Sequence, residues 1–374
     1  MKILHLINTI DRGGAENHLY CLARGQKKLV SDIHIIYLKG NDYWYDSLIK
    51  EKIKVTKIKN FSKLNFIRQI KFVKNYIKKF NITIVHSHLP YMEILGYFAT
   101  KNLRNVKFII SKHVDNNFIG GSIKKNKSIF SDFIDYIMFK RVNKIIAISY
   151  AVKNYFIKNY FSNFENKIEV IYYGIDNKYI ESCLNKDGSD NLNYLKSNPD
   201  EIIFGYIGRL VKQKQVELII YSFNVLRKKT SRKIKLLIVG DGPEKKKLKS
   251  IVNKLELNEE VKFINHQNKV GEIIKLIDIF CMNSKFEGLG LIMLEVMHFL
   301  KPIIAPSISA IPEVVKNDVN GLIVKPNDEF EYSNAMLSLL DNKKRKKLSL
   351  QTTDILNNKF NFHTMINKTL KLYN

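Results

Sequence analysis

The sequence predicts an α/β protein with two consecutive domains, each built on a parallel β-sheet. The chain has 374 residues, more than one ordinary hydrophobic core requires. Short β-branched segments alternate with amphipathic segments, as in βαβ units. A polar stretch at 183–200 interrupts this alternation, which then starts again. We therefore expect two Rossmann-like domains that face each other across a cleft at the carboxyl ends of their strands.

Residues 1–180 form the first predicted domain. Helices are expected at Glu16–Lys28 and Ser62–Phe80, because apolar residues of the second segment recur at helical spacing. Short β-branched runs between the helices are expected to be buried strands. These predicted strands are Lys2–Ile7, Asp32–Leu38, Ile82–His86, Lys107–Ser111, Lys144–Ile148 and Glu169–Tyr172.

Residues 181–200 are predicted to be a linker, since polar residues dominate there without periodicity. Residues 201–358 then form the second predicted domain. A helix at about 360–374 follows it, and we expect that helix to pack back on the first domain. The strands expected in the second domain are Ile202–Ile207, Lys235–Val239, Val261–Ile264, Ile279–Met282, Pro302–Ala305 and Gly321–Val324.

The formal net charge of +27 is large, and residues 1–180 carry the greater share of it. A basic surface attracts nucleic acid, anionic lipid or polyanionic substrates. A chain this rich in Lys also carries Lys on every surface, so the composition leaves both interpretations open.

The cysteines and the hydropathy pattern point to the cytoplasm. Cys21, Cys183 and Cys281 are far apart and form no CxxC or Cys/His cluster, so we expect reduced thiols. No uncharged apolar stretch reaches the length of a membrane span. We therefore expect a cytoplasmic protein that does not cross a bilayer.

The first motif with a chemical meaning is the glycine pair Gly13 and Gly14, between the first strand and the first helix. Paired glycines let backbone amides approach an anion at a helix N-terminus. A glycine turn at this place is also common for steric reasons. The pattern is not GxGxxG, and no acidic residue ends the next strand, which argues against a dinucleotide cofactor.

The second motif is Arg209 with Lys214, directly after the strand at Ile202–Ile207. A guanidinium with fork geometry and a mobile ammonium are suited to holding a diphosphate between them. Two solvated cations in a Lys-rich loop are the alternative interpretation of this pair.

The third motif, from Glu287 to Glu295, decides between these interpretations. Gly288 and Gly290 stand at the first turn of a predicted helix, whose free amides suit a phosphate. The two carboxylates suit sugar hydroxyls better than phosphate. Glu295 follows an apolar segment, which argues against a plain surface position. The motif therefore predicts a site for a phosphorylated sugar.

With these motifs in place, the chain resembles glycosyltransferase family 4, the retaining enzymes of the GT-B fold. The matching motifs have the family's order and spacing over nearly the full length. They are Gly13-Gly14-Ala15-Glu16, His86-Ser87-His88-Leu89-Pro90, Ser111-Lys112-His113, Ile171-Tyr172-Tyr173-Gly174-Ile175-Asp176, Gly208-Arg209-Leu210 with Lys214, Gly240-Asp241-Gly242-Pro243, Glu287 to Glu295, Ile311-Pro312-Glu313-Val314 and Asn320-Gly321-Leu322.

The resemblance implies a role for each matching residue of the donor site. Arg209 and Lys214 would bind the donor diphosphate. Glu287 would meet hydroxyls of the transferred sugar, and Glu295 those of the ribose. The residues implied to complete the phosphate cradle are Gly13, Gly14, Gly288, Leu289, Gly290 and Leu291.

The resemblance also assigns two histidines. It implies that His88 is catalytic together with Glu287 and stands beside the reacting sugar, and that His113 lines the acceptor side. Each is expected near the carboxyl end of a predicted strand. A lone histidine is more often a structural hydrogen-bonding group, and that is the expectation for His5, His18, His34, His266, His298 and His363.

Three positions depart from the common family pattern. Tyr173 stands where many members have Asn, Ser309-Ala310 where many have Gly-Gly, and Gln215 where a glycine is usual. None of them is an Arg, Lys or Glu of the motifs. The identity of the donor sugar and of its base therefore stays open.

The predicted function is transfer of a hexose-type sugar from a nucleoside-diphosphate sugar, such as a UDP sugar, to a saccharide or lipid-linked saccharide. Bacterial surface polysaccharide or lipopolysaccharide synthesis is the expected setting, and retention rests on the resemblance alone. Cations and amides are expected to stabilise the leaving diphosphate, and no Asp-x-Asp motif is present, so we expect neither a metal nor another cofactor. A nucleotide-sugar epimerase of the same fold is the alternative. A nucleic-acid partner is not expected, because no nucleic-acid-binding module is found.

The helix predicted at Ser62–Phe80 carries a cationic stripe of Arg68, Lys71, Lys74 and Lys78. Together with Lys and Asn at 124–127, this stripe is able to rest on anionic lipid, at about 1 kcal/mol per cation. A solvated helix face is the other interpretation. Peripheral contact with the cytoplasmic membrane is therefore an expectation that stays open.

Overall fold

The computed structural model describes residues 1–59, 63–114, 118–119, 122–123, 136–158, 162–184, 195, 198, 200–267 and 269–374. The chain divides into two units. Unit 1 comprises Met1–Gly174 and Asn361–Asn374, and unit 2 comprises Ile175–Phe360. The chain thus enters unit 2 a few residues before the predicted boundary at 180. Most of the predicted linker and the basic segment at 124–127 lie outside the described residues.

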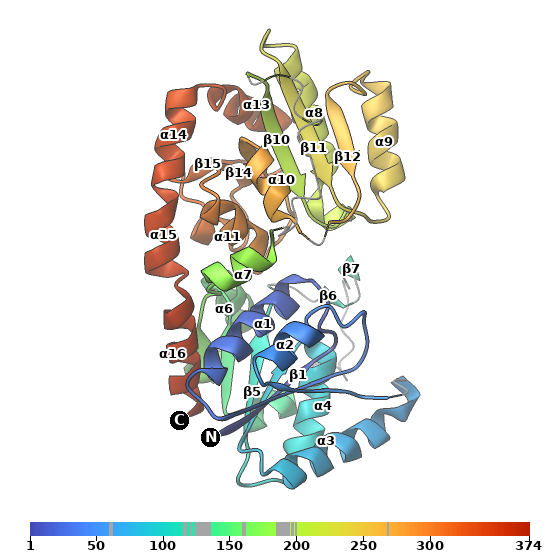
Figure 1. Cartoon of the computed structure of the whole chain (residues 1–374), viewed down its shortest axis with the longest axis vertical. Helices are drawn as coiled ribbons and strands as arrows, with labels where there is room; N and C mark the ends of the chain where they lie inside the picture. Colours follow the sequence, from blue (N-terminus) through green and yellow to red (C-terminus); the bar gives the residue numbers. More distant parts are fainter. Residues whose placement is uncertain are drawn as a thin grey trace. The chain divides into compact units, whose positions relative to one another are not determined.

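Unit 1 is built on a seven-stranded parallel sheet with the strand order β3-β2-β1-β4-β5-β8-β9 (Figure 1). Its strands are β1 (Lys2–Ile7), β2 (Asp32–Tyr37), β3 (Lys54–Lys57), β4 (Ile84–His88), β5 (Lys107–Lys112), β8 (Lys144–Ala147) and β9 (Ile168–Val170), with a separate antiparallel pair β6 (Phe118–Ile119) and β7 (Ser122–Ile123). Its helices are α1 (Gly14–Lys27), α2 (Tyr45–Lys50), α3 (Phe66–Phe80), α4 (Pro90–Thr100), α6 (Tyr150–Phe156) and α16 (Phe362–Tyr373), with 3₁₀ turns at Lys63–Asn65 and Ser162–Lys167.

Strands β3 and β4 of unit 1 are among those that differ from the prediction. The strand predicted at Ile82–His86 is β4, two residues further on, because its ladder with β1 pairs Ile3 with Ile84. His88 is therefore the last residue of the strand and does not follow it. The edge strand β3 was not predicted, since a four-residue strand that begins and ends with Lys lacks an apolar run.

Helix α16 packs on α1 within unit 1 (Figure 1). The contact is close because Gly25 has no side chain: a Cβ there would lie 2.5 Å from Cδ1 of Ile366. Gly174 lies equally close, since its Cβ would lie 2.6 Å from Cα of Phe362. The last helix of the chain therefore belongs to the core of the unit formed by the first residues.

Unit 2 is built on a six-stranded parallel sheet with the order β12-β11-β10-β13-β14-β15 (Figure 1). Its strands are β10 (Ile202–Ile207), β11 (Ile234–Val239), β12 (Val261–Ile264), β13 (Ile279–Cys281), β14 (Ile303–Pro306) and β15 (Gly321–Val324). Its helices are α7 (Asn177–Ser182), α8 (Val216–Arg227), α9 (Lys245–Lys254), α10 (Gly271–Leu276), α11 (Leu291–His298), α12 (Ile311–Val314), α13 (Glu329–Ser338), α14 (Asn342–Leu350) and α15 (Thr352–Lys359), with a 3₁₀ turn at Lys212–Lys214.

The core of unit 2 forms between its sheet and the helices α8, α9 and α13. Phe204 on β10 and Phe223 on α8 are fully buried in it, and burial of each such side chain contributes about 1.5–3 kcal/mol. Tyr332 of α13 is also fully buried, and its hydroxyl lies 3.1 Å from the carbonyl of Met282 and 3.0 Å from that of Ile304. The predicted α/β class with two parallel sheets is confirmed.

Among the described residues, no helix combines the length and the apolar character that crossing a bilayer requires.

Candidate functional site

In unit 2, the loop after β10 is bound to the loop after β13. Nζ of Lys214 lies 2.6 Å from Oε2 of Glu287, and the two side chains are only 13% and 15% exposed. The Gln213 side chain donates to the carbonyl of Phe286 at 2.9 Å, and the N–H of Lys285 donates to the carbonyl of Gln213 at 2.8 Å. Strands β10 and β13 are neighbours in the sheet, so both loops lie at its carboxyl edge. The structure therefore brings the predicted Lys214 and Glu287 together.

Arg209 lies in the same loop as Lys214. Its carbonyl accepts a hydrogen bond from the buried hydroxyl of Tyr206 at 2.9 Å, and burial raises the pKa of Tyr206. The next residue, Leu210, donates its N–H to the carbonyl of Asp241 in the loop after β11. The guanidinium of Arg209 is exposed and forms no ion pair within the described part of the chain. The backbone is thus held in place while the cation is free to meet an anion.

Helix α11 begins at Leu291, four residues after Glu287, with Gly290 as its N-cap. Gly290 has φ 81°, and a Cβ there would lie 2.7 Å from Cε of Met293 and 3.1 Å from Cγ of Glu287. The positive φ favours glycine at this position. The predicted cradle at Gly288 to Leu291 therefore presents the N-terminal amides of α11 beside the carboxylate of Glu287.

Glu295 is not a surface residue. It is 4% exposed on α11, and its carboxylate accepts a short hydrogen bond from the hydroxyl of Tyr179 on α7. Its predicted contact with a ribose stays a prediction.

The loops after β11 and β12 form the neighbouring part of this edge. The carboxylate of Asp241 pairs with Lys245 and accepts from the N–H of His266 at 2.7 Å. These two interactions lower the pKa of Asp241, the Lys245 hydrogen bond most. Lys245 also donates to Asn265 at 2.6 Å.

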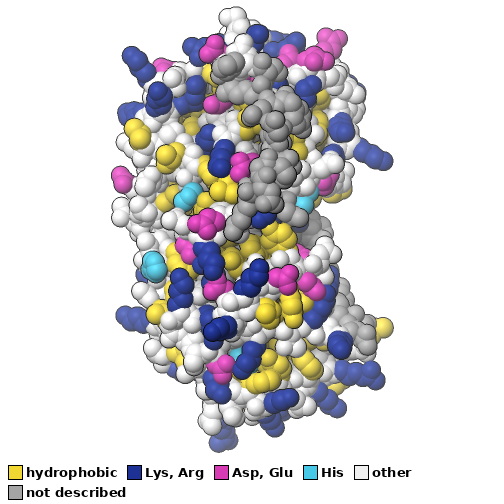
Figure 2. Space-filling model, viewed as in Figure 1, with side chains coloured by type: hydrophobic (Ala, Val, Ile, Leu, Met, Phe, Trp, Pro, Cys, Tyr) yellow, Lys and Arg dark blue, Asp and Glu magenta, His cyan; other side chains and the backbone are white. Residues whose placement is uncertain are grey.

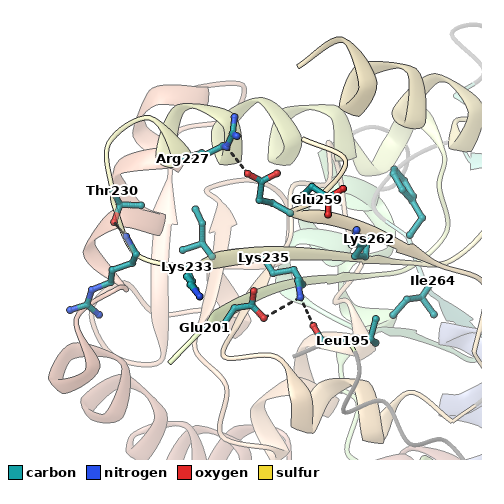
Figure 3. Close-up of a pocket in the computed structure, with 13 residues that line it drawn as sticks. Leu195, Glu201, Arg227, Thr230, Lys233, Lys235, Glu259, Lys262 and Ile264 are labelled. Atoms are coloured by element: carbon teal, nitrogen blue, oxygen red, sulfur yellow. Dashed lines mark hydrogen bonds and ion pairs between the residues drawn. The ribbon is translucent and has the colours of Figure 1, made fainter. Parts of the chain in front are cut away.

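A different pocket, of about 770 Å³, lies near the amino ends of β10, β11 and β12 (Figure 3). Four of its charged side chains pair with one another. Lys235 lies 3.1 Å from Glu201 and donates to the carbonyl of Leu195 at 2.7 Å, and Arg227 lies 2.6 Å from Glu260. Parallel sheets of this kind bind ligands at the carboxyl ends of their strands. We therefore place the candidate site at the carboxyl edge and not in this pocket.

In unit 1, the predicted glycine pair precedes α1. A Cβ on Gly13 would lie 2.4 Å from the carboxylate of Glu16, whereas a Cβ on Gly14 would have no atom within 4 Å. The Glu16 carboxylate accepts from the hydroxyl of Thr9 at 2.8 Å. Gly13 is thus required by the side chain of Glu16, and the exposed Gly14 leaves open space beside its backbone.

The predicted His88 and His113 lie in a cluster of buried histidines in unit 1. His86 and His88 point to the same face of β4, because they are two residues apart, and His86 is paired in register with His5 on β1. His5, His86 and His88 are fully buried, and His113 is 8% exposed. The ring of His18 on α1 also joins the cluster, with its centroid 5.8 Å from that of His113.

Both ring nitrogens of His88 are hydrogen-bonded inside the cluster. Its Nε2 lies 3.2 Å from Nδ1 of His5, and its Nδ1 lies 3.2 Å from Nε2 of His113. Nδ1 of His113 is bound in turn to the hydroxyl of Tyr173. The contact of His88 with a sugar stays a prediction, but in this geometry neither nitrogen is free to make it.

Burial keeps these histidines neutral. It lowers the pKa of His5 to about 4 and that of His113 to about 3. It also lowers the pKa values of His18, His86 and His88 well below the ordinary range, with further lowering by neighbouring histidines.

The backbone is strained directly after His88. Leu89, between β4 and α4, has φ 73° and ψ 147°, a region that is unfavourable for a residue with a side chain. Pro90 then starts α4 at the position where proline is favoured. Strained residues of this kind cluster at functional sites, which supports a site at this end of β4.

Sequence reasoning missed the part played by His5, His86 and Tyr173. The pattern His86-Ser87-His88 contained one usable signal, since alternate residues of a strand share a face. That β1 lies beside β4, which brings in His5, is a property of the strand order.

Two family models match the chain. The model described as "Glycosyltransferase Family 4" matches residues 12–179, and the model described as "Glycosyl transferases group 1" matches residues 190–353. The chain belongs to the family 4 glycosyltransferases. The predicted family and the assignment as a glycosyltransferase are confirmed.

Similar proteins agree in length and fold. The UDP-Gal:alpha-D-GlcNAc-diphosphoundecaprenol alpha-1,3-galactosyltransferase of Escherichia coli is 26% identical, over 91% of this chain and 88% of that protein. The capsular polysaccharide biosynthesis glycosyltransferase CapM of Staphylococcus aureus is 25% identical, over 100% and 97%. Among solved structures, a glycosyltransferase from Rickettsia africae has a TM-score of 0.82 at 22% identity, over 100% and 97% of the chains. Anabaena HepE in complex with UDP and glucose has a TM-score of 0.81 at 19% identity, over 99% and 98%. These structures share the GT-B fold with this chain.

Replacement of Gly290 by alanine is expected to destabilise unit 2 by about 1–3 kcal/mol, because the positive φ is unfavourable for a residue with a Cβ. Hydrogen exchange of unit 2 peptides measures the loss. Gly14→Ala is the matched control, since no atom lies within 4 Å of its Cβ position. A Gly290→Ala protein as stable as the wild type would contradict the tight, left-handed backbone at the start of α11.

The stability of unit 1 is expected to fall as the pH falls below about 6.5. Below this pH the histidines of the unfolded chain bind protons, whereas the buried histidines of the folded chain stay neutral. The free energy of unfolding therefore falls by about 1.4 kcal/mol per pH unit for each such histidine, until the pH reaches the pKa of that histidine in the folded state. For His5 alone this amounts to about 2 kcal/mol at pH 5. The chain's one tryptophan, the buried Trp44, reports on unit 1 in urea titrations. Equal stability at pH 7 and pH 5 would show that the histidines are not held neutral.

Proposed function

We propose that the protein transfers a hexose-type sugar from a UDP sugar to a hydroxyl group of a saccharide or lipid-linked saccharide, with retention of configuration. The observation that carries the proposal lies in unit 2, where Lys214 and Glu287 meet beside the N-terminus of α11 and the cation of Arg209 is exposed next to them. The cations and the helix N-terminus suit a diphosphate, and the carboxylate suits the hydroxyl groups of an attached sugar.

In the proposed reaction, negative charge develops on the diphosphate as the glycosidic bond breaks. Arg209, Lys214 and the amides at the start of α11 stabilise that charge, and a preorganised donor of this kind contributes about 3 kcal/mol. Because fixed cations and amides perform this task, we propose that the reaction requires no metal ion. The acceptor hydroxyl loses its proton near the departing phosphate, on the same face of the sugar.

Glu287 has two tasks in this proposal. Without substrate, its carboxylate holds the ammonium of Lys214 in place. With substrate, Lys214 turns to the diphosphate, and the carboxylate accepts hydrogen bonds from sugar hydroxyls. Glu295 is assigned to the ribose hydroxyls. Gly13, Gly14, His88 and His113 keep the roles that the family resemblance implies.

Three named proteins support the choice of substrates. The Escherichia coli relative is named for a UDP-linked galactose and a diphosphoundecaprenol acceptor, and the Staphylococcus aureus relative for capsular polysaccharide. The Anabaena structure contains UDP and glucose. UDP and a lipid-linked saccharide are therefore the donor nucleotide and the acceptor that we propose.

We further propose that unit 1 rests on an anionic membrane surface through α3 and the turn before it. Apolar side chains are exposed there beside cations: Leu64 is 96%, Ile67 68% and Phe72 39% exposed, and Arg68 and Lys71 are exposed with them. On the face that Figure 2 shows, Lys and Arg side chains are scattered from top to bottom. The combination of exposed apolar groups with cations distinguishes α3 from a merely solvated helix.

Arg209→Ala is expected to abolish slow hydrolysis of a UDP sugar and to lower the thermal stabilisation of the protein by UDP, because the mutation removes an exposed diphosphate ligand. A panel of nucleotide sugars identifies the donor. The matched control is Arg227→Ala, which removes an arginine of the same unit that pairs with Glu260 near the other end of the sheet. An Arg209→Ala protein that hydrolyses the donor like the Arg227→Ala control would refute the site, and activity without any acceptor-dependent product would favour an epimerase.

The wild-type protein is expected to float with vesicles containing anionic lipid at low salt. Leu64→Ser with Ile67→Ser should reduce the bound fraction about tenfold, because each apolar side chain withdrawn from water contributes on the order of 1.5 kcal/mol or more. Leu350→Ser is the control, as Leu350 is 72% exposed beside Lys residues of α14 in unit 2. The proposal is wrong if the wild-type protein stays at the bottom of the gradient.

A further inference from the structure

A continuous chain of hydrogen bonds crosses the interior of unit 1, and we call it the histidine chain. The hydrogen bonds that link His113, His88 and His5 continue from His5 to further residues. Nε2 of His5 lies 2.8 Å from the side-chain oxygen of Gln26, whose amide nitrogen donates to the hydroxyl of Tyr373 at 3.2 Å. That hydroxyl lies 2.6 Å from Nδ1 of His86. In order, the members of the chain are Tyr173, His113, His88, His5, Gln26, Tyr373, His86 and Ser111.

The chain has a single direction, which the amide of Gln26 sets. An amide oxygen only accepts, so Nε2 of His5 carries the proton and Nδ1 accepts. The same reasoning passes along the chain: Nε2 of His88 donates to His5, Nε2 of His113 donates to His88, and the hydroxyl of Tyr173 donates to His113.

The other end follows in the same direction. The Tyr373 hydroxyl accepts from Gln26 and therefore donates its own proton to Nδ1 of His86. Nε2 of His86 then donates to the hydroxyl of Ser111 at 2.8 Å. Turning the Gln26 amide would reverse every bond at once, so all four histidines share one tautomer in either direction.

Two other uses of this cluster fit less well. His5, His86 and His88 are close enough together to suggest a metal site. Each of them already uses both ring nitrogens in the chain, so a metal would have to break two or more hydrogen bonds. A path that exports protons would need an exit, whereas Ser111, at the far end, is fully buried.

We infer that Tyr373 and Gln26 are positioning residues that hold His88 and His113 in one neutral tautomer at the carboxyl edge of the unit 1 sheet. Tyr373 acts from the last helix of the chain, which explains why α16 is packed into unit 1. Tyr173, which departs from the family pattern, closes the outer end of the chain. The effect of Tyr373 and Gln26 on activity rests on the proposed function, whereas their effect on the histidine tautomers is independent of it.

The direct test is nitrogen NMR of the wild-type protein labelled at histidine, without substrate, at pH 7. The ring signals of His5, His86, His88 and His113, assigned with single substitutions, are expected to show a proton on the same ring nitrogen, Nε2, in all four. Different tautomers among the four, or a charged ring, would overturn the inference. Zinc that binds tightly and shifts the signals of His5, His86 and His88 together would also overturn it.

The second test compares Tyr373→Phe with Tyr76→Phe. Both remove a tyrosine hydroxyl bonded to a buried histidine of unit 1, but the Tyr76 hydroxyl is bonded to His34 at 2.9 Å, outside the histidine chain. Tyr373→Phe is expected to give mixed tautomers at His88 and His113 and a kcat for sugar transfer about three- to tenfold lower, as the loss of one hydrogen bond allows. Tyr76→Phe should change neither.

The two tests separate the inference from the proposed function. Thermal stabilisation by UDP depends on residues outside the histidine chain and should be the same in Tyr373→Phe and in the wild type. If UDP stabilises neither protein, the proposed function is wrong. The tautomers measured by NMR then still test the inference about the histidine chain. If UDP binds and Tyr373→Phe keeps wild-type kcat and tautomers, or if Tyr76→Phe matches its loss, Tyr373 is not a positioning residue.

Discussion

The ion pair between Lys214 and Glu287 is the interaction on which the donor site depends. The two residues are far apart in sequence, and they meet because β10 and β13 are neighbours in a parallel sheet whose loops emerge at one edge. The pair holds the ammonium beside the first turn of α11 before any substrate arrives. The ammonium is therefore already at this edge, and it has only to turn from the carboxylate to the diphosphate when the substrate binds.

The same property of parallel sheets produces the histidine cluster of unit 1. Strands β1, β4 and β5 are adjacent, and the residues at their carboxyl ends converge. There the result is different, because the converging groups are buried and bond to one another. Burial makes the charged form of each ring unfavourable, and a chain of neutral rings then has one consistent pattern of donors and acceptors. One sheet edge is therefore dominated by exposed and paired charges, and the other by neutral hydrogen bonds.

Much of this organisation could be predicted from local sequence. The strand Ile202–Ile207, which has no charged residue, begins and ends where predicted, because burial on both faces selects such residues. The apolar neighbours of Glu295 correctly argued against a surface position. Gly290 was expected at the start of a helix, and it is the N-cap of α11.

Other features depend on contacts that no local pattern contains. The edge strand β3 has too few apolar residues to be recognised. The bond between Gln26 and Tyr373 joins residues at opposite ends of the chain, and the one from Tyr179 to Glu295 joins α7 to α11. Tyr173 was noted only as a departure from the family, although its hydroxyl closes the histidine chain. Strand order and helix docking determine these partners.

The most direct test of the donor site is calorimetric titration of UDP into the wild type, Lys214→Ala and Glu287→Gln. If Lys214 binds the diphosphate and Glu287 the sugar, Lys214→Ala should weaken UDP binding about tenfold or more. Glu287→Gln should bind UDP at least as tightly as the wild type, since the mutation frees the ammonium, and should still lose sugar transfer. Equal weakening of UDP binding in both variants, or unchanged binding in Lys214→Ala, would contradict the division of tasks between the two residues.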